Sequence, residues 1–190
     1  MADEELASAL SAAARGDSGA FATLWWSLQP AVLRYLRVIV GEAAEDVASE
    51  TWLQAARDLR GFSGPPAAFR VWLFTIARHR AIDDRRRARR RPEEPHVLGD
   101  QDVAAVQPDV AYDVIQRSGT DWALGVIASL PKDQAEAVML RVVAGLDVAQ
   151  TAQVLGKRAG AVRIAAMRGL RRLADHPEVQ ARRSPRAEGV

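Results

Sequence analysis

Apolar residues recur at intervals of three and four along most of the chain, and the strict alternation typical of a half-buried β-strand is scarce. The predicted fold class is therefore all-α. The spacing predicts helices at residues 3–15, 17–40, 42–59, 67–90, 121–130, 132–144, 147–155 and 159–174.

Glycine, proline and capping residues set the expected helix boundaries in the first half. Gly16 ends the first helix, Asp17 or Ser18 caps the second, and Gly41 separates the second helix from the third. The stretch "RGFSGPPAA", residues 60–68, is expected to be a loop because its glycines and prolines disfavour a helix interior.

Residues 92–119 separate the two groups of helices. They contain three prolines, several aspartates and little periodicity, and they are longer than most loops inside a compact domain. We therefore expect two small helical domains, residues 1–91 and 120–175, joined by an acidic flexible linker at residues 92–119. The remaining residues, 176–190, are expected to form a disordered tail.

The segment "AGLDVAQTAQVLGKRAGAVRIAAMRGLRRL" has the spacing of a helix-turn-helix. Gly145 ends one helix, and Asp147 caps the next with Gln150 as its reciprocal partner. Gly156 then turns the chain toward the final helix.

The final helix is predicted to have one buried and one exposed arc. The expected buried arc consists of Val162, Ala166, Gly169, Leu170 and Leu173, and the opposite arc of Ile164, Met167, Arg168 and Arg171. Arginines on an exposed arc can contact phosphates or guanine edges in a major groove. The alternative is an ordinary amphipathic helix with a solvated basic face, and the two exposed apolar residues fit either thymine methyl groups or a protein interface.

Charge is organised in blocks, although the net charge of the chain is only +2. Residues 1–77 carry −3, residues 78–91 carry +6, residues 92–130 carry −6 and residues 131–175 carry +4. Two basic blocks separated by an acidic one indicate two contacts with a polyanion such as a nucleic acid.

The first basic block lies on the fourth predicted helix. Its apolar residues Phe69, Trp72, Leu73 and Ile76 share one arc, whereas Arg78, Arg85 and Arg89 lie opposite, with His79 between. A basic face beside an aromatic loop suits single-stranded DNA, because arginines follow the phosphates while planar groups hold bases. The alternative is a basic arm without sequence preference, and Trp72 is most simply a core residue.

Several classes of function are disfavoured by composition. The chain has no cysteine, and its three histidines lack metal-ligand spacing, so we expect no metal and no cofactor. It shows no nucleophile with a base and no phosphate loop, so we expect no enzyme. We also expect no membrane insertion and a cytoplasmic location, because no apolar run is long enough for a span and the N-terminus is acidic.

Three segments together resemble bacterial RNA polymerase sigma factors of the extracytoplasmic-function (ECF) group. The segment "FRVWLFTIARHRAIDDRRR" resembles the promoter-melting part of that family, and "AEDVASETWLQAAR" resembles its polymerase-binding helix. The helix-turn-helix resembles its second domain. The resemblance implies that the chain binds core RNA polymerase and promoter DNA, and helps to open the −10 element.

The same resemblance assigns residues to each task. Core polymerase would be bound by Asp46, Glu50 and Trp52, with Ser49 in place of the usual glutamine. A flipped −10 base would enter a pocket made by the loop containing Phe62 and by His79, where the family often has asparagine. The phosphates of the −10 strand would be held by Arg78, Arg85, Arg86 and Arg89.

The −35 element would be read as a duplex by the final helix. The residues implied are Arg158, Arg163, Ile164, Met167, Arg168 and Arg171. Arg158 stands where the family has a serine or threonine cap, which implies an unusual −35 sequence or more reliance on backbone contacts and DNA shape. An anti-sigma factor is a possible further partner. The alternative function is a stand-alone helix-turn-helix transcriptional regulator that does not bind polymerase.

Overall fold

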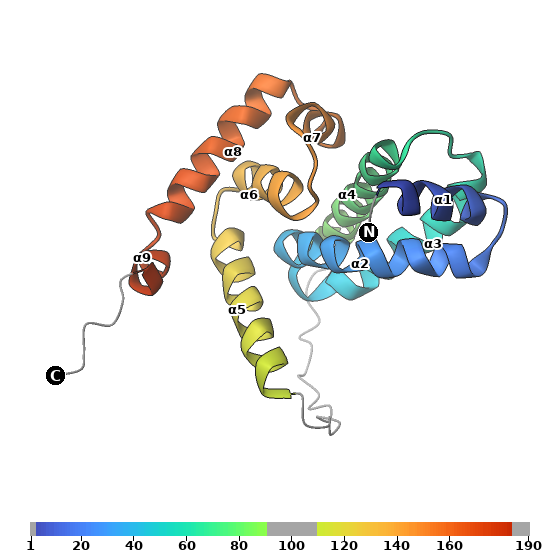
Figure 1. Cartoon of the computed structure of the whole chain (residues 1–190). Helices are drawn as coiled ribbons and strands as arrows, with labels where there is room; N and C mark the ends of the chain where they lie inside the picture. Colours follow the sequence, from blue (N-terminus) through green and yellow to red (C-terminus); the bar gives the residue numbers. More distant parts are fainter. Residues whose placement is uncertain (1–2, 91–109, 184–190) are drawn as a thin grey trace.

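The computed structural model describes residues 3–90 and 110–183 (Figure 1). Within these two segments every regular element is helical, which confirms the all-α prediction. The first segment carries α1 to α4, and the second carries α5 to α9 with the helix-turn-helix (Figure 1).

The helices of the first segment agree closely with the predicted ranges. They are α1 (Asp3–Ala14), α2 (Ser18–Val40), the 3₁₀ turn η1 (Gly41–Ala43), α3 (Ala44–Asp58), the 3₁₀ turn η2 (Leu59–Gly61) and α4 (Pro66–Arg90). Asp17 caps α2, since its carboxylate accepts a hydrogen bond from the Ala20 amide at 2.9 Å. Gly41 ends α2 with a φ of 62°, a conformation that favours glycine.

The second segment contains the predicted helix-turn-helix. Its elements are α5 (Val110–Ala128), α6 (Lys132–Val138), the π-helix η3 (Met139–Val143), α7 (Val148–Leu155), α8 (Ala159–Ala174) and α9 (Pro177–Arg183). Asp147 and Gln150 form the expected reciprocal capping box at the start of α7. The predicted turn at Gly156 is present, and the structure gives this glycine a left-handed conformation with a φ of 62°.

Two expectations of irregular structure are wrong in part. Helix α5 begins at Val110, so the last ten residues of the expected flexible linker are helical, while residues 92–109 lie outside the described part. No proline follows Pro108 in this stretch, and extending an existing helix is easier than starting one, so α5 can grow backwards from its packed end.

The expected disordered tail also contains a helix, α9. Trp122 of α5 holds it, because the indole Nε1 donates a hydrogen bond to Glu178 at 2.6 Å. The guanidinium carbon of Arg182 lies 3.9 Å from the centre of the Trp122 ring, in a cation–π arrangement. Sequence periodicity missed α9 because two contacts with one distant tryptophan hold this short helix in place.

Helix α2 forms the centre of the first segment and packs against α1, α3 and α4. Tyr35 of α2 and Phe74 of α4 meet edge to face at 5.6 Å, and both are completely buried. Apolar burial of this kind is the main driving force for packing the bundle.

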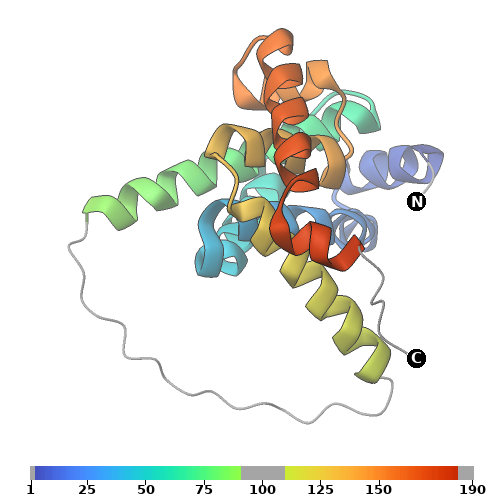
Figure 2. The ribbon, with the colours of Figure 1, turned by 90° about the vertical axis from the view of Figure 1, so that its left-hand side faces the viewer.

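The two segments share one hydrophobic core. Helix α4 packs against α7, and α2 packs against α5, α6 and η3 (Figure 2). The buried cluster accordingly joins first-segment residues to Leu124, Met139 and Leu155 of the second segment. The sequence predicted two domains, and it gave no sign that their apolar surfaces lie against each other.

Gly169 permits the close approach of α8 to α6. A Cβ atom at this position would lie 2.8 Å from Val138 Cγ2 and 3.3 Å from the Gln134 backbone oxygen. The neighbouring Leu170, which we predicted to be buried, is instead 49% exposed. The side of α8 that contains Gly169 is therefore the side that packs against α6, and Leu170 lies outside this contact.

We expect Gly169→Ala to destabilise the protein by about 1–3 kcal/mol, the usual range for overpacking a well-packed core. Gly160→Ala on the same helix is the matched control, because its Cβ would meet no atom within 4 Å. Gly160→Ala should stabilise the protein by about 0.4–1 kcal/mol, because alanine lowers the conformational entropy of the unfolded chain. Urea unfolding followed by circular dichroism measures both, and equal midpoints for the two variants would contradict the packing argument.

Candidate nucleic-acid and polymerase interfaces

Helix α3 presents an acidic, exposed face. Asp46 and Ser49 are exposed, and Glu50 is half-buried. The Ser49 hydroxyl donates to the Glu45 carbonyl of its own helix at 2.9 Å, so it is already engaged within α3. The exposed carboxylate of Asp46 and the part of the Glu50 carboxylate that Arg87 of α4 leaves accessible are therefore the polar groups that this face offers to a partner.

Trp52, which the resemblance placed at the polymerase surface, is a core residue. Only 5% of it is exposed, and its Nε1 donates a hydrogen bond to the Gln29 side chain at 2.7 Å. The Phe21 ring meets it edge-on at 5.9 Å. Trp52 therefore fixes α3 against α2, and its side chain is not available for direct contact with a partner.

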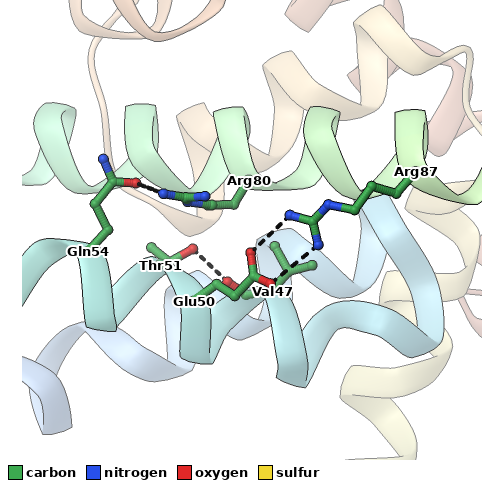
Figure 3. Close-up of polar contacts among 6 residues, drawn as sticks. All are labelled: Val47, Glu50, Thr51, Gln54, Arg80 and Arg87. Atoms are coloured by element: carbon green, nitrogen blue, oxygen red, sulfur yellow. Dashed lines mark hydrogen bonds and ion pairs between the residues drawn. The ribbon is translucent and has the colours of Figure 1, made fainter.

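Two arginines of α4 reach down to α3 (Figure 3). Arg87 lies 3.4 Å from each carboxylate oxygen of Glu50, and this neighbour raises the pKa of Arg87 above its ordinary value. Two turns nearer the N-terminus of α4, and one turn nearer the C-terminus of α3, Arg80 donates two hydrogen bonds to the Gln54 side chain at 2.8 and 2.9 Å. These contacts fix the acidic face of α3 relative to the basic helix α4.

The loop before α4 forms an open aromatic pocket of about 540 Å³. Phe62 and Trp72 face each other across 5.3 Å between ring centres, and Phe69 supports both rings. Trp72 is half-buried, so it lines the pocket in addition to packing against the core. The remaining lining residues are Asp58, Gly61, Ser63, Ala68, Val71, Thr75 and Gln153.

Arg78 does not lie free on the DNA side of α4, contrary to the prediction. Its Nε lies 3.7 Å from Glu136 Oε1 of α6, and the two side chains are only 19% and 2% exposed. Tyr35 is buried nearby, where burial and the charge of Glu136 raise the pKa of its hydroxyl. The second segment therefore covers this part of α4. The sequence gave no signal for the pairing of Arg78 with Glu136, because a glutamate is rarely buried.

The other predicted −10 residues remain accessible. His79, Arg86 and Arg89 are exposed, and Arg85 is half-buried. Arg86 makes an exposed ion pair with Asp83 at 3.8 Å, which contributes little. His79 is not among the residues lining the Phe62 pocket, so the structure does not bring these two predicted base readers together.

Helix α8 exposes all of the predicted −35 residues. Arg158, Arg163, Arg168 and Arg171 are exposed, as are Ile164 and Met167 at 48% and 61%. The side chain of Arg158 makes no capping hydrogen bond, although its backbone is in the extended conformation of an N-cap. The predicted buried residues Val162, Ala166 and Gly169 do face the core, so the arcs are as expected apart from Leu170.

No group of three or more histidine, cysteine, aspartate or glutamate side chains suited to a metal ion occurs among the described residues. No described helix is long and apolar enough to span a bilayer.

Each of the two segments matches a known family model. Residues 24–91 match the family model of sigma-70 region 2, and residues 121–173 match that of sigma-70 region 4. These matches cover the segment with the aromatic pocket and basic α4, and the segment with the helix-turn-helix.

Curated relatives extend the match over most of the chain. The ECF RNA polymerase sigma factor ShbA of Streptomyces griseus is 34% identical over 172 residues, which cover 85% of this chain and 89% of ShbA. The ECF RNA polymerase sigma factor SigD of Mycobacterium tuberculosis is 32% identical over 185 residues, which cover 92% of this chain and 85% of SigD.

The fold is also that of a solved structure, CnrH in complex with the cytosolic domain of CnrY. The TM-score is 0.63 at 20% identity, with 95% of this chain and 99% of that chain covered. With both family regions matched in order and relatives aligned over most of its length, the chain belongs to the ECF group of RNA polymerase sigma factors.

Proposed function

We propose that this sigma factor assigns three tasks to three faces: core polymerase binding to α3, −10 recognition to α4 with its preceding loop, and −35 recognition to α8. The observation that carries the proposal is the fully exposed basic face of α8 on a chain that also presents a basic α4 and an aromatic pocket. The chain would act in the cytoplasm, where polymerase and DNA are found, and no residue is assigned a catalytic role.

Core polymerase meets the carboxylates of Asp46 and Glu50. Ser49 supplies at most a shared hydroxyl, because its hydrogen bond already goes to Glu45. Trp52 contributes by holding α3 in place. Arg87 contacts Glu50 and so transmits the position of α3 to the DNA-binding helix.

The −10 strand lies along α4. A flipped base stacks against Phe62 and Trp72, with Ser63 and Thr75 available as hydrogen-bond partners in the pocket wall. Arg85, Arg86 and Arg89 hold phosphates beyond the pocket, and His79 lies between these two regions on the exposed side of α4.

The −35 duplex accepts α8 in its major groove. Arg163 and Arg168 contact base edges or phosphates, and Ile164 and Met167 pack against thymine methyl groups. Arg158 and Arg171 hold the backbone at the two ends of the contact. The same apolar residues, with Leu170, also fit an anti-sigma partner, since all three are exposed.

A stand-alone regulator, the alternative function, would need only the helix-turn-helix. In vitro transcription with added core polymerase and a randomised promoter library tests the proposal directly. We expect transcripts with defined start points only when the chain and core polymerase are both present. Strong sequence-specific duplex binding by the chain alone, without transcription, would support the regulator instead.

Arg168→Ala should lower −35-dependent transcription by about ten- to a hundredfold, the effect of losing about 1–3 kcal/mol at a base contact. Core polymerase affinity should stay unchanged, because α8 lies apart from α3. Arg183→Ala, which removes the same charge from α9, is the control. A parallel fall in core affinity for Arg168→Ala would refute the division of tasks between α3 and α8.

Replacing Arg85, Arg86 and Arg89 together by alanine should flatten the salt dependence of single-stranded DNA binding. Each phosphate contact with a single strand contributes about 0.7 to the slope of log affinity against log salt, so the slope should fall by about 2. Fluorescence anisotropy with a random-sequence 20-mer measures it.

The control for this experiment replaces Arg34, Arg57 and Arg183, three exposed arginines outside the proposed interface. This variant should keep the slope of the unmodified protein. An unchanged slope in the α4 variant would show that these arginines do not hold phosphates.

A further inference from the structure

Helix α9 lies beyond the helix-turn-helix and contacts the far end of α8, the proposed −35 helix. It also begins after residue 173, where the match to sigma-70 region 4 ends. The helix leaves α8 at an angle and lies against α5 (Figure 1). Neither the helix-turn-helix motif nor the family match therefore gives α9 a task.

The C-terminal end of α8 has little packing of its own. Val162, near the start of the helix, is completely buried. After Gly169, only Leu173 is half-buried, and the other residues up to position 175 are exposed. Helix ends with few buried contacts open easily, and the last carbonyls of a helix lack partners within it. The end of α8 that carries Arg171 therefore depends on contacts from outside the helix.

Helix α9 supplies contacts of this kind. The Gln180 side chain donates a hydrogen bond to the Ala174 carbonyl in the last turn of α8. On its other side, α9 is held by Trp122 of α5, whose Nε1 donates to Glu178 and whose ring lies under the Arg182 guanidinium. One indole thus binds an anion with its N–H edge and a cation with its face, as the charge distribution of the ring favours. These three residues, Trp122, Glu178 and Arg182, form the Trp122 cluster.

The N-terminal end of α8 is fixed independently of α9. Lys157, next to Arg158, pairs with Asp133 of α6 at 2.6 Å. Gly156 sets the turn before it, and Val162 anchors the first turns of α8 in the core. The two ends of the proposed −35 contact are therefore held by different parts of the chain.

We propose that the Trp122 cluster positions one end of the −35 contact: it holds α9, and α9 holds the last turn of α8 in the orientation in which Arg171 meets the DNA backbone. The inference rests on the function proposed above for α8. A side chain that is already ordered in the free protein loses less conformational entropy on binding, so a fixed helix end binds DNA more tightly than a frayed one. The members of the cluster act through α8 and are positioning residues.

Hydrogen exchange of the whole chain tests the positioning step without DNA. Trp122→Ala should make the amides of residues 171–175 exchange about tenfold faster, because both contacts between α5 and α9 are lost. The amides of residues 163–167, nearer the start of α8, should exchange as in the unmodified protein. Equal acceleration of both groups, or no acceleration at residues 171–175, would overturn the proposal.

Two substitutions of Glu178 isolate the hydrogen bond at an exposed site. Glu178→Ala removes the acceptor of the indole N–H, whereas Glu178→Gln keeps a side-chain carbonyl oxygen that can accept it. We expect faster exchange at residues 171–175 in the alanine variant and recovery in the glutamine variant. The same exchange in both variants would show that this hydrogen bond does not hold α9, and would contradict the proposal.

A double-mutant cycle connects the Trp122 cluster to the −35 contact. The probe is a duplex carrying the −35 element selected from the randomised promoter library, and the protein is the complex of the chain with core polymerase. Trp122→Ala should weaken binding of this duplex about three- to tenfold, and most of this loss should vanish in the Arg171→Ala background, as for coupled residues. In the Arg158→Ala background the loss should be retained in full.

Arg183→Ala removes an exposed charge of α9 outside the cluster and is the control. It should change neither the exchange rates nor the duplex affinity. An equal loss for Trp122→Ala in both arginine backgrounds would mean that Trp122 supports the fold in general, and the proposal would fail. If exchange at residues 171–175 depends on Trp122 while no −35 element can be selected, the positioning of the helix end stands and the function proposed for α8 fails.

Discussion

The burial of α2 is the constraint on which the rest of the structure depends. This helix packs against α1, α3 and α4 in the first segment and against α5, α6 and η3 in the second. Tyr35 lies where α2 meets α4, and its ring contacts Phe74. Its hydroxyl is buried near Glu136 of the second segment, whose charge acts on it. One apolar helix therefore fixes the promoter-melting helix and also receives the helix-turn-helix.

The arginine-rich run of α4 shows how packing divides a uniform sequence into different roles. Arg80 and Arg87 turn toward α3 and bond to Gln54 and Glu50. Arg78 turns toward α6, whereas Arg86 and Arg89 remain exposed. Counting charges identifies the arginine-rich run. Which of its arginines form internal contacts and which stay available to bind a polyanion depends on the helices that pack against each face of α4.

The sequence predicted what local chemistry determines. Asp17, Gly41, Asp147 and Gly156 act where they were expected, because caps and glycine turns depend on a few adjacent residues. Long-range contacts were missed: Trp52 is buried by Gln29 and Phe21, and Leu170 stays exposed because the close approach at Gly169 already defines the packed edge. Helix α9 was missed for the same reason, since Trp122 lies far away in sequence.

The contact between the two segments determines which groups α4 presents at its surface. Arg78 would otherwise extend the exposed arginine run, but its Nε lies 3.7 Å from the buried Glu136 Oε1 of α6. Neither of these two atoms has a hydrogen-bond partner within the described segments, so the pair opposes part of the apolar burial around it. Gln153 of α7 lines the same pocket as Phe62 and Trp72, so the wall of this pocket comes from both segments. The surface that α4 offers to a single strand is therefore a property of the two segments together and cannot be derived from the arginine-rich helix alone.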